Sequence, residues 1–162
     1  MKLATTDWLT GLHNRRNFET ITDLEIAKQK RYGGVFSLVF IDLDNFKMLN
    51  DALGHHAGDS ALKLLAQILR EHTRTTDSIA RLGGDEFAIL MPNILESDCH
   101  SMCNHLSGMI EKMMAESHFD ITASIGHTTF DHAPESTITA IQIADKAMYA
   151  AKRKGKKCVF CL

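Results

Sequence analysis

The sequence predicts an α/β domain in which helices flank a mixed central β-sheet. Helical and strand-like periodicities alternate along the chain, as expected for a layered α/β architecture. An almost continuously apolar run at residues 35–41 is typical of a central strand that is covered on both faces. Paired glycines between two strand-like runs indicate a hairpin, which forces at least one antiparallel strand pair.

The expected elements follow from the apolar spacing and from the residues that end each run. The glycine pair at residues 33–34 ends the first helix, and Gly54 closes the second. In chain order we expect a helix over 14–31, a strand over 35–43, helices over 45–53 and 57–73, strands over 78–82 and 87–91, a helix over 95–115, a strand over 121–128, a helix over 138–154 and an edge strand over 157–160.

Apolar residues at helical spacing predict which face of each helix meets the sheet. The first helix is expected to bury Phe18, Ile21, Leu24 or Glu25, and Ala27 or Lys28. The helix over 57–73 is expected to bury Ala61, Leu64, Leu65, Ile68 and Leu69. The helix over 95–115 is expected to bury Met102, Leu106, Met109 and Met113. The helix over 138–154 is expected to bury Ile138, Ile141, Ala144, Met148 and Ala151.

Size and composition favour one domain over residues 1–162. The chain has 44% hydrophobic and 23% charged residues, which excludes a disordered tail or a collagen-like repeat. A formal charge of -2 argues against a nucleic-acid or acidic-membrane partner. The longest strongly apolar stretch is far shorter than the ~20 residues that span a bilayer, and the N-terminus lacks a signal-peptide core. We therefore expect a cytoplasmic protein without direct membrane contact.

The four cysteines allow two interpretations. Cys99 and Cys103 are four residues apart on an expected helix, and Cys158 and Cys161 lie near the C-terminus, so a four-ligand zinc cluster is conceivable. Neither pair has the turn-forming surroundings of a zinc knuckle. In a reducing compartment free cysteines usually behave as small core hydrophobes, and we favour that interpretation.

Carboxylates gather where the buried strand ends. Asp42 and Asp44 stand two residues apart, so their side chains leave the same face of the strand, and Asp85 and Glu86 lie in the hairpin turn. If the hairpin pairs beside this strand, the carboxylates converge where Mg²⁺ could bridge them. The alternative is that Asp44 caps the following helix and that Asp85 and Glu86 are turn residues only.

Cations and amide groups near this point could face a nucleotide. Lys47 follows the strand end, and the end of the last helix is rich in cations, which could bind a polyphosphate or simply be a solvated helix terminus: Lys152, Arg153, Lys154, Lys156 and Lys157. Asn50 and Asp59 could read the donor and acceptor groups of guanine, or be ordinary surface residues of their helices.

Several segments resemble one known family. The run RLGGDEF at residues 81–87 resembles the signature of the GGDEF family, the diguanylate cyclases. Other segments resemble further family motifs in the same order, and together they cover nearly the whole chain: DWLTGLHNRR at 7–16, FIDLDNFK at 40–47, ND at 50–51, GHHAGD at 54–59, ASIG at 123–126 and ADKAMY at 144–149. The resemblance implies the nucleotide-cyclase, palm-like fold of that family.

The resemblance also implies a role for each site residue. Asp42, Asp85 and Glu86 would be catalytic and would bind Mg²⁺, or Mn²⁺, with a backbone carbonyl from Leu43. Asp44 would lie behind the metal ligands or cap a helix. Lys47 and Lys152 would hold phosphates, as would Lys156, which stands where the family often has arginine. Gly83 and Gly84 would contact the substrate, and Asn50 and Asp59 would read guanine, the carboxylate at position 59 favouring GTP over ATP.

The implied reaction condenses two GTP molecules into cyclic di-GMP and two pyrophosphates. Because each domain would bind one GTP, a second copy of the chain would be needed, and we expect the usual upstream sensor or dimerisation module to be absent from this chain. Arg74 and Asp77 resemble the family's RxxD product-inhibition motif, although a plain helix-end ion pair is the alternative. The main competing function is a catalytically weak or inactive receptor for GTP or cyclic di-GMP.

Overall fold

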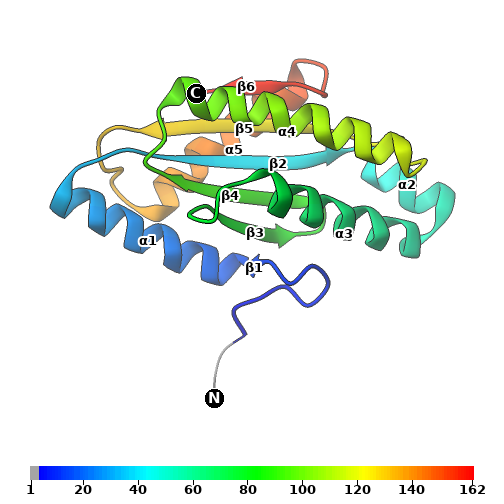
Figure 1. The fold of residues 1–162 in the computed structure, drawn as a ribbon, viewed down its shortest axis with the longest axis horizontal. Coiled ribbons are helices and arrows are strands. Elements are labelled where there is room, and N and C mark those ends of the chain that lie inside the picture. Colours follow the sequence, from blue (N-terminus) through cyan, green and yellow to red (C-terminus); the bar gives the residue numbers. More distant parts are fainter. Residues whose placement is uncertain (1–3) are drawn as a thin grey trace.

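The computed structural model describes residues 4–162, so the domain predicted over 1–162 is seen from residue 4 onward. Helices cover both faces of a single six-stranded sheet (Figure 1). The strands are β1 (His13–Asn14), β2 (Phe36–Asp44), β3 (Ser78–Gly83), β4 (Glu86–Pro92), β5 (Thr122–Phe130) and β6 (Val159–Cys161). The helices are α1 (Arg15–Tyr32), α2 (Phe46–Leu53), α3 (His55–His72), α4 (Glu96–Glu116) and α5 (Thr137–Arg153).

The sheet is mixed, as predicted. Its strand order is β1-β3-β4-β2-β5-β6. The four inner strands pair antiparallel, whereas β1 and β6 pair parallel to their neighbours at the two edges. The predicted sequence of elements is confirmed, except that β1 was not expected. Two residues are too few to show a strand periodicity, so this edge strand carries no signal in the sequence.

The central strand β2 divides the core into two layers. All nine of its residues are buried, and their side chains alternate between the faces of the sheet. Val39 and Ile41 pack in the layer that contains α3 and α4. Leu38 and Phe40 pack in the layer that contains α1 and α5. The apolar run in the sequence therefore reflects a strand that is covered on both sides, as predicted.

The buried stripe of α4 differs from the predicted one. Its fully buried residues are Cys99, Cys103, Leu106, Ile110 and Met114. The predicted Met102, Met109 and Met113 are only half-buried and flank this stripe. The buried stripe therefore runs through Cys99 and Cys103 rather than through the methionines. Thiols pack like short hydrophobic side chains, so these two cysteines fit against the sheet.

Two other helices bury unexpected polar residues and expose expected apolar ones. On α1, Leu24 is 66% exposed, whereas Thr22 and Gln29 are buried. The Gln29 amide nitrogen donates to backbone carbonyls of Gly34 and Phe130, and the Thr22 hydroxyl donates to a carbonyl one turn back, whereas the Gln29 side-chain oxygen has no hydrogen-bond partner within the described residues. On α5, the predicted Ile138 is 70% exposed, and small residues such as Ala140 and Ala147 face the sheet instead.

All four cysteines are free, and two of them, Cys99 and Cys103, are buried as the favoured interpretation expects. Cys99 and Cys103 lie in the core, and the Cys158 thiol donates to the backbone carbonyl of Ala151 at 3.1 Å. No group of three or more Cys, His, Asp or Glu side chains within residues 4–162 is arranged to hold a metal ion, so the cysteines form no zinc cluster there.

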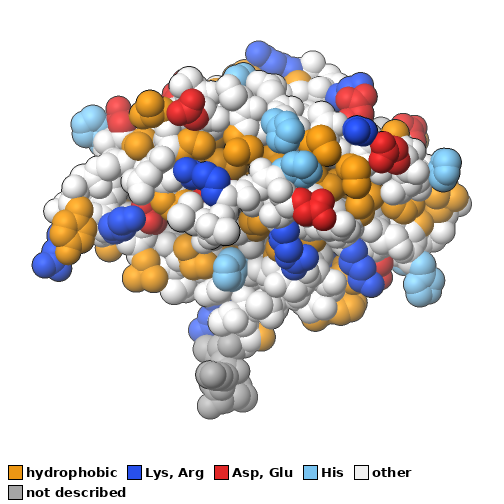
Figure 2. Space-filling view, viewed as in Figure 1, with side chains coloured by type: hydrophobic (Ala, Val, Ile, Leu, Met, Phe, Trp, Pro, Cys, Tyr) orange, Lys and Arg blue, Asp and Glu red, His pale blue; other side chains and the backbone are white. Residues whose placement is uncertain are grey.

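The surface carries both signs of charge. Figure 2 shows acidic, basic and histidine side chains interspersed with apolar ones on the face that α3 and α4 cover. This mixture agrees with the nearly balanced charge of the sequence. None of the helices within residues 4–162 is both long enough and apolar enough to cross a membrane.

Candidate active site

The hairpin between β3 and β4 lies beside the end of β2, as the sequence predicts. Strand β4 pairs directly with β2, and this pairing sets Asp42 opposite Glu86. The backbone N–H of Leu43 reaches the carbonyl oxygen of Asp85 at 3.4 Å. The pairing of β2 with β4 therefore places the hairpin turn beside the end of β2, where the carboxylates of that strand lie.

The two glycines of the turn are required by the backbone. Gly83 has a φ of 146° and Gly84 a φ of 49°, and side chains other than hydrogen are disfavoured in both conformations. A Cβ atom at either position would meet nothing within 4 Å, so neither glycine is needed for internal packing. The turn leaves open space above its backbone, into which a ligand can approach closely.

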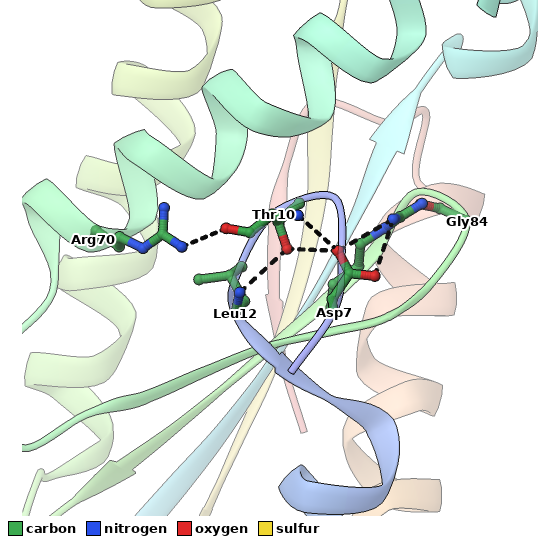
Figure 3. A network of polar contacts seen from close by, with 6 residues as sticks. Asp7, Thr10, Leu12, Arg70 and Gly84 are labelled. Carbon is green, nitrogen blue, oxygen red and sulfur yellow. Dashed lines mark hydrogen bonds and ion pairs between the residues drawn. The ribbon is translucent and has the colours of Figure 1, made fainter. Parts of the chain in front are cut away.

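Arg81 fastens this hairpin to the N-terminal loop (Figure 3). Its guanidinium donates to the carbonyl oxygen of Gly84 at 2.8 Å and contacts the Asp7 carboxylate at 3.2 Å. Asp7 also accepts from the backbone N–H and the hydroxyl of Thr10, whose carbonyl oxygen accepts from Arg70. Burial acts to raise the pKa of Asp7, but the Thr10 hydrogen bonds and the Arg81 charge outweigh it and hold this pKa below its usual value.

These contacts give a role to residues that reasoning about individual side chains did not single out. Asp7 and Thr10 lie in the segment 7–16 and Arg81 opens the segment 81–87, which are two of the motifs that carry the family resemblance. These family motifs were therefore the signal in the sequence that could have pointed to the three residues. Their physical link could not be read from the sequence, because 74 positions separate Asp7 from Arg81.

Asp42 is a buried carboxylate with an unusual environment. Its side chain is nearly covered, and Lys152 Nζ lies 2.9 Å from Oδ1. The two groups form an ion pair, and Oδ1 accepts no hydrogen bond within the described residues. Burial raises the pKa of Asp42 to about 7, and the like charge of Asp85 adds to this effect while Lys152 opposes it.

This pair of carboxylates suits a hard divalent cation. Asp42 and Asp85 repel each other, and Oδ1 of Asp42 is a buried oxygen that is ion-paired with Lys152 but accepts no hydrogen bond within the described residues. Both features are costly in the protein alone and are relieved by an ion that prefers oxygen ligands. The third predicted ligand, Glu86, instead has its carboxylate 3.8 Å from Arg15 Nη2. The structure thus brings together two of the three expected carboxylates.

Asp44 does not cap α2, which corrects one of the two predicted roles. Asn45 occupies the N-cap position with a φ of 64° and makes no side-chain cap hydrogen bond. The Asp44 carboxylate is instead buried against β5 and the segment that follows α5, where it accepts three hydrogen bonds. Cross-strand neighbours compete with the local cap for this side chain, and a sequence does not show which of them wins.

The predicted phosphate-binding lysines come from α2, from α5 and from the turn that follows α5. Lys47 is exposed on the first turn of α2. Lys152 reaches Asp42 from the last turn of α5, and Lys156 Nζ lies 3.4 Å from the Asn45 side-chain oxygen. Lys152 and Lys156 therefore point toward the end of β2, where a polyphosphate beside the carboxylates would need positive charge.

Asn50 and Asp59 lie on packed neighbouring helices, α2 and α3. The Asn50 side-chain oxygen is buried and has no hydrogen-bond partner. It sits so close to Gly58 that a Cβ atom there would be 1.9 Å away. Asp59 follows Gly58 in the chain and is half-buried. The two helices thus contribute an amide and a carboxylate, which are the kinds of group that can pair with the donors and acceptor of guanine.

Arg74 and Asp77 form an ion pair just after α3. Arg74 Nη2 lies 2.7 Å from the Asp77 carboxylate and also donates to the carbonyl oxygen of Pro92 at 2.8 Å. The Asp77 side chain is fully buried, whereas that of Arg74 is 38% exposed. The helix-end ion pair that we considered is present, and part of the guanidinium is still open to solvent.

Comparison with known proteins places these features in one family. Residues 4–158 match the family model described as "Diguanylate cyclase, GGDEF domain". Diguanylate cyclase DosC of Escherichia coli K12 is 38% identical over 157 residues, which cover 94% of this chain and 34% of that protein. Diguanylate cyclase DgcP of Pseudomonas aeruginosa is 39% identical over 158 residues, which cover 94% of this chain and 23% of that protein.

The fold is similar to that of a solved structure. The coiled coil and GGDEF domain of DgcB from Caulobacter crescentus, crystallised in complex with c-di-GMP, matches with a TM-score of 0.90 and 30% sequence identity, covering 98% of this chain and 85% of that one. This match confirms the predicted fold class. The chain itself spans only 34% of one curated relative and 23% of the other.

Proposed function

Because the chain belongs to the GGDEF domain family, we propose that it is a diguanylate cyclase, which condenses two GTP molecules into cyclic di-GMP and two pyrophosphates. The relatives named diguanylate cyclase support this activity. The observation that carries the proposal is the buried Asp42 beside Asp85, with the Lys152 ammonium 2.9 Å from its Oδ1.

Asp42 and Asp85 would hold a divalent cation, Mg²⁺ or Mn²⁺, with a backbone carbonyl from Leu43. When bound, the ion would supply positive charge that neutralises the triphosphate and the departing pyrophosphate. Glu86 would join these ligands once its carboxylate leaves Arg15, from which it is 3.8 Å away in this structure.

The lysines and the hairpin would bind and orient the triphosphate. Lys47, Lys152 and Lys156 would each contribute a point charge, without the bidentate geometry that an arginine offers. Gly83 and Gly84 would let the hairpin backbone approach the phosphates, because no side chain projects from either position. Positioning and electrostatics supply most of the catalysis in this class of reaction.

Asn50 and Asp59 would select the base. The Asp59 carboxylate would accept from the N–H groups of guanine, which adenine does not present in the same pattern. The unpartnered Asn50 oxygen would gain a hydrogen bond in the complex. A site built to pair these groups rejects a ligand that leaves them unpaired.

The chemistry would require two copies of the domain. The 3′-hydroxyl of one GTP attacks the α-phosphorus of the other, forming an O3′–P bond as the bond to pyrophosphate breaks, and the hydroxyl proton is lost. One domain holding one GTP cannot bring these atoms together. Two facing domains would do so twice and close the ring.

The direct test is incubation of concentrated protein with Mg²⁺ and either GTP or ATP, followed by chromatography of the products. We expect cyclic di-GMP from GTP alone. Asp85→Asn should reduce turnover by roughly 100-fold or more, because it removes a charge that acts on the transferring phosphoryl group. Asp131→Asn is the matched control, since the Asp131 side chain is highly exposed and pairs with the neighbouring His132. Full turnover in Asp85→Asn would contradict the proposal.

A receptor function is the second candidate. The Arg15–Glu86 contact favours it, because it holds one of the expected metal ligands away from the pair. A receptor would bind GTP or cyclic di-GMP in the same assay without forming product at any protein concentration. That outcome would select the receptor over the enzyme.

Arg74 and Asp77 would form a product-inhibition site. The half-exposed Arg74 guanidinium can bind a phosphate and stack on guanine, while Asp77 holds it in place. We expect micromolar-range cyclic di-GMP to inhibit the enzyme, and Arg74→Ala to relieve this inhibition. Arg31→Ala, at an exposed arginine on α1, should behave as the wild type. Unchanged product affinity in Arg74→Ala would refute the assignment.

A further inference from the structure

One buried carboxylate at the end of β2 is not used by the proposed metal site. Asp44 is only 1% exposed. Its Oδ1 accepts from the Ser124 hydroxyl at 2.7 Å. Its Oδ2 accepts from the Thr122 hydroxyl at 2.8 Å and from the backbone N–H of Lys157 at 3.0 Å. The two hydroxyls tie Asp44 to the neighbouring strand β5, but the third donor belongs to a separate segment.

That segment is the turn over 154–157, which links α5 to β6. Three consecutive residues in it have left-handed backbone conformations, with φ values of 113° at Gly155, 65° at Lys156 and 46° at Lys157. Such values are ordinary for glycine but unfavourable for lysine, and they persist only where surrounding contacts impose them. The hydrogen bond from Lys157 to Asp44 is a contact of this kind, and it comes from outside the turn.

The conformation of this turn sets the direction of Lys156, the residue before Lys157. Lys156 Nζ lies 3.4 Å from the Asn45 side-chain oxygen, at the residue next to Asp44. The Lys157 side chain points elsewhere and pairs with Glu111 of α4. The backbone of Lys157 is therefore held by Asp44 and its side chain by α4, while Lys156 is left facing the end of β2.

We propose that Asp44 is a positioning residue for the phosphate site: its carboxylate fixes the turn over 154–157 so that Lys156 faces the triphosphate. This inference rests on the proposed function, since the triphosphate is the ligand that Lys156 would meet. Asp44 acts through the turn and does not touch the substrate. Its contribution to binding is therefore expressed only while the Lys156 ammonium is present.

A double-mutant cycle tests this dependence. The variants are Asp44→Asn, Lys156→Ala and the two together. Asparagine keeps the shape of the side chain but replaces one acceptor oxygen with a donor. The measurement is the Kd of 3′-deoxy-GTP with Mg²⁺, because this analogue lacks the attacking hydroxyl and cannot turn over. We expect each single change to weaken binding by roughly tenfold, and the double change to weaken it no more than the stronger single one.

Ser37→Ala is the matched control. Ser37 and Thr129 share a hydrogen bond of 2.6 Å between the same two strands, β2 and β5, toward their other ends. Its loss should lower the thermal stability without changing the Kd. Effects of Asp44→Asn and Lys156→Ala that multiply to about 100-fold in the double variant would overturn the inference, because Asp44 would then act independently of Lys156.

If Asp44→Asn does not fold, Gly155→Ala provides a second test of the inference. A Cβ atom at Gly155 meets nothing within 4 Å, so the substitution strains the turn through its φ of 113° without a clash. It should also weaken binding, and again without adding to Lys156→Ala. Wild-type affinity in Gly155→Ala would overturn the inference. Failure of the wild-type protein to bind 3′-deoxy-GTP would instead overturn the proposed function on which the inference rests.

Discussion

At the residue scale, two buried aspartates at the end of β2 have different polar surroundings. Asp44 is surrounded by three hydrogen-bond donors, whereas Asp42 keeps an oxygen without a hydrogen bond and lies near Asp85. Buried charge is tolerated only when it is paired or hydrogen-bonded. Asp42 is paired with Lys152 but also lies near the like charge of Asp85, so an added cation would relieve that repulsion, whereas Asp44 is already satisfied by its three donors.

The environment of Asp42 predicts a pH dependence of stability in the absence of divalent cations. Its pKa is about 7 in the folded protein against an ordinary value of 3.8, so the folded state holds the proton more tightly between these values. The contribution of Asp42 to the free energy of unfolding should therefore fall as the pH rises through this window. Asp42→Asn should be more stable than the wild type at pH 8, by a few degrees in Tm, and the difference should shrink toward pH 5.

Thermal unfolding in a chelating buffer at both pH values measures this difference. Asp51→Asn is the control, because Asp51 is exposed on α2 and should show no such change between the two pH values. A stability gap for Asp42→Asn that widened as the pH fell would contradict the assignment.

At the element scale, the packing of α2 against α3 positions Asn50, one of the two residues proposed to read guanine. Helices α2 and α3 meet at Gly58, whose missing Cβ leaves room for the Asn50 side chain. The spacing of apolar residues predicted both helices, but it did not reveal this contact. The same limit explains α4, where the methionines marked the right face only approximately and the two cysteines occupy its centre.

Gly58→Ala tests the role of this contact. The added methyl group would lie 1.9 Å from the Asn50 oxygen, so Asn50 must move and its contact with guanine should be lost. We expect affinity for 3′-deoxy-GTP to fall by roughly tenfold or more, which corresponds to the loss of one well-placed polar contact.

The matched control is Gly108→Ala on α4. Gly108 is also helical, but a Cβ atom there meets nothing within 4 Å. This substitution should stabilise the protein by about 0.5 to 1 kcal/mol, because alanine favours the helix over glycine, and it should leave nucleotide affinity unchanged. Equal affinities in the two alanine variants would show that Gly58 does not position Asn50.

At the scale of the whole molecule, the site is assembled from segments that are distant in the sequence. The sheet order places β4 between β3 and β2, which sets the hairpin against Asp42, and α5 brings Lys152 to the same edge. All of these groups lie within one copy of the chain, yet the proposed reaction joins two nucleotides. The assembly of two copies should therefore limit the rate.

Fusion of the chain to a dimeric coiled coil tests this limit. At low protein concentration, we expect the fused protein to form cyclic di-GMP faster per domain than the free chain, because the second copy is held at a high effective concentration. The control is the same fusion with a coiled coil that carries substitutions preventing dimerisation. Equal initial rates per domain with and without the functional coiled coil would contradict the requirement for two facing copies.

The amino-acid sequence by itself determined the α/β class, the central strand with two covered faces, the hairpin and the segments that carry the site. Each of these follows from local patterns: apolar periodicity, paired glycines and short motifs. Tertiary structure alone decided that Asp44 holds the turn after α5, that Glu86 faces Arg15 and that Gly58 makes room for Asn50. These outcomes depend on which of several polar partners packing brings within reach, and such a competition leaves no periodic trace in a sequence.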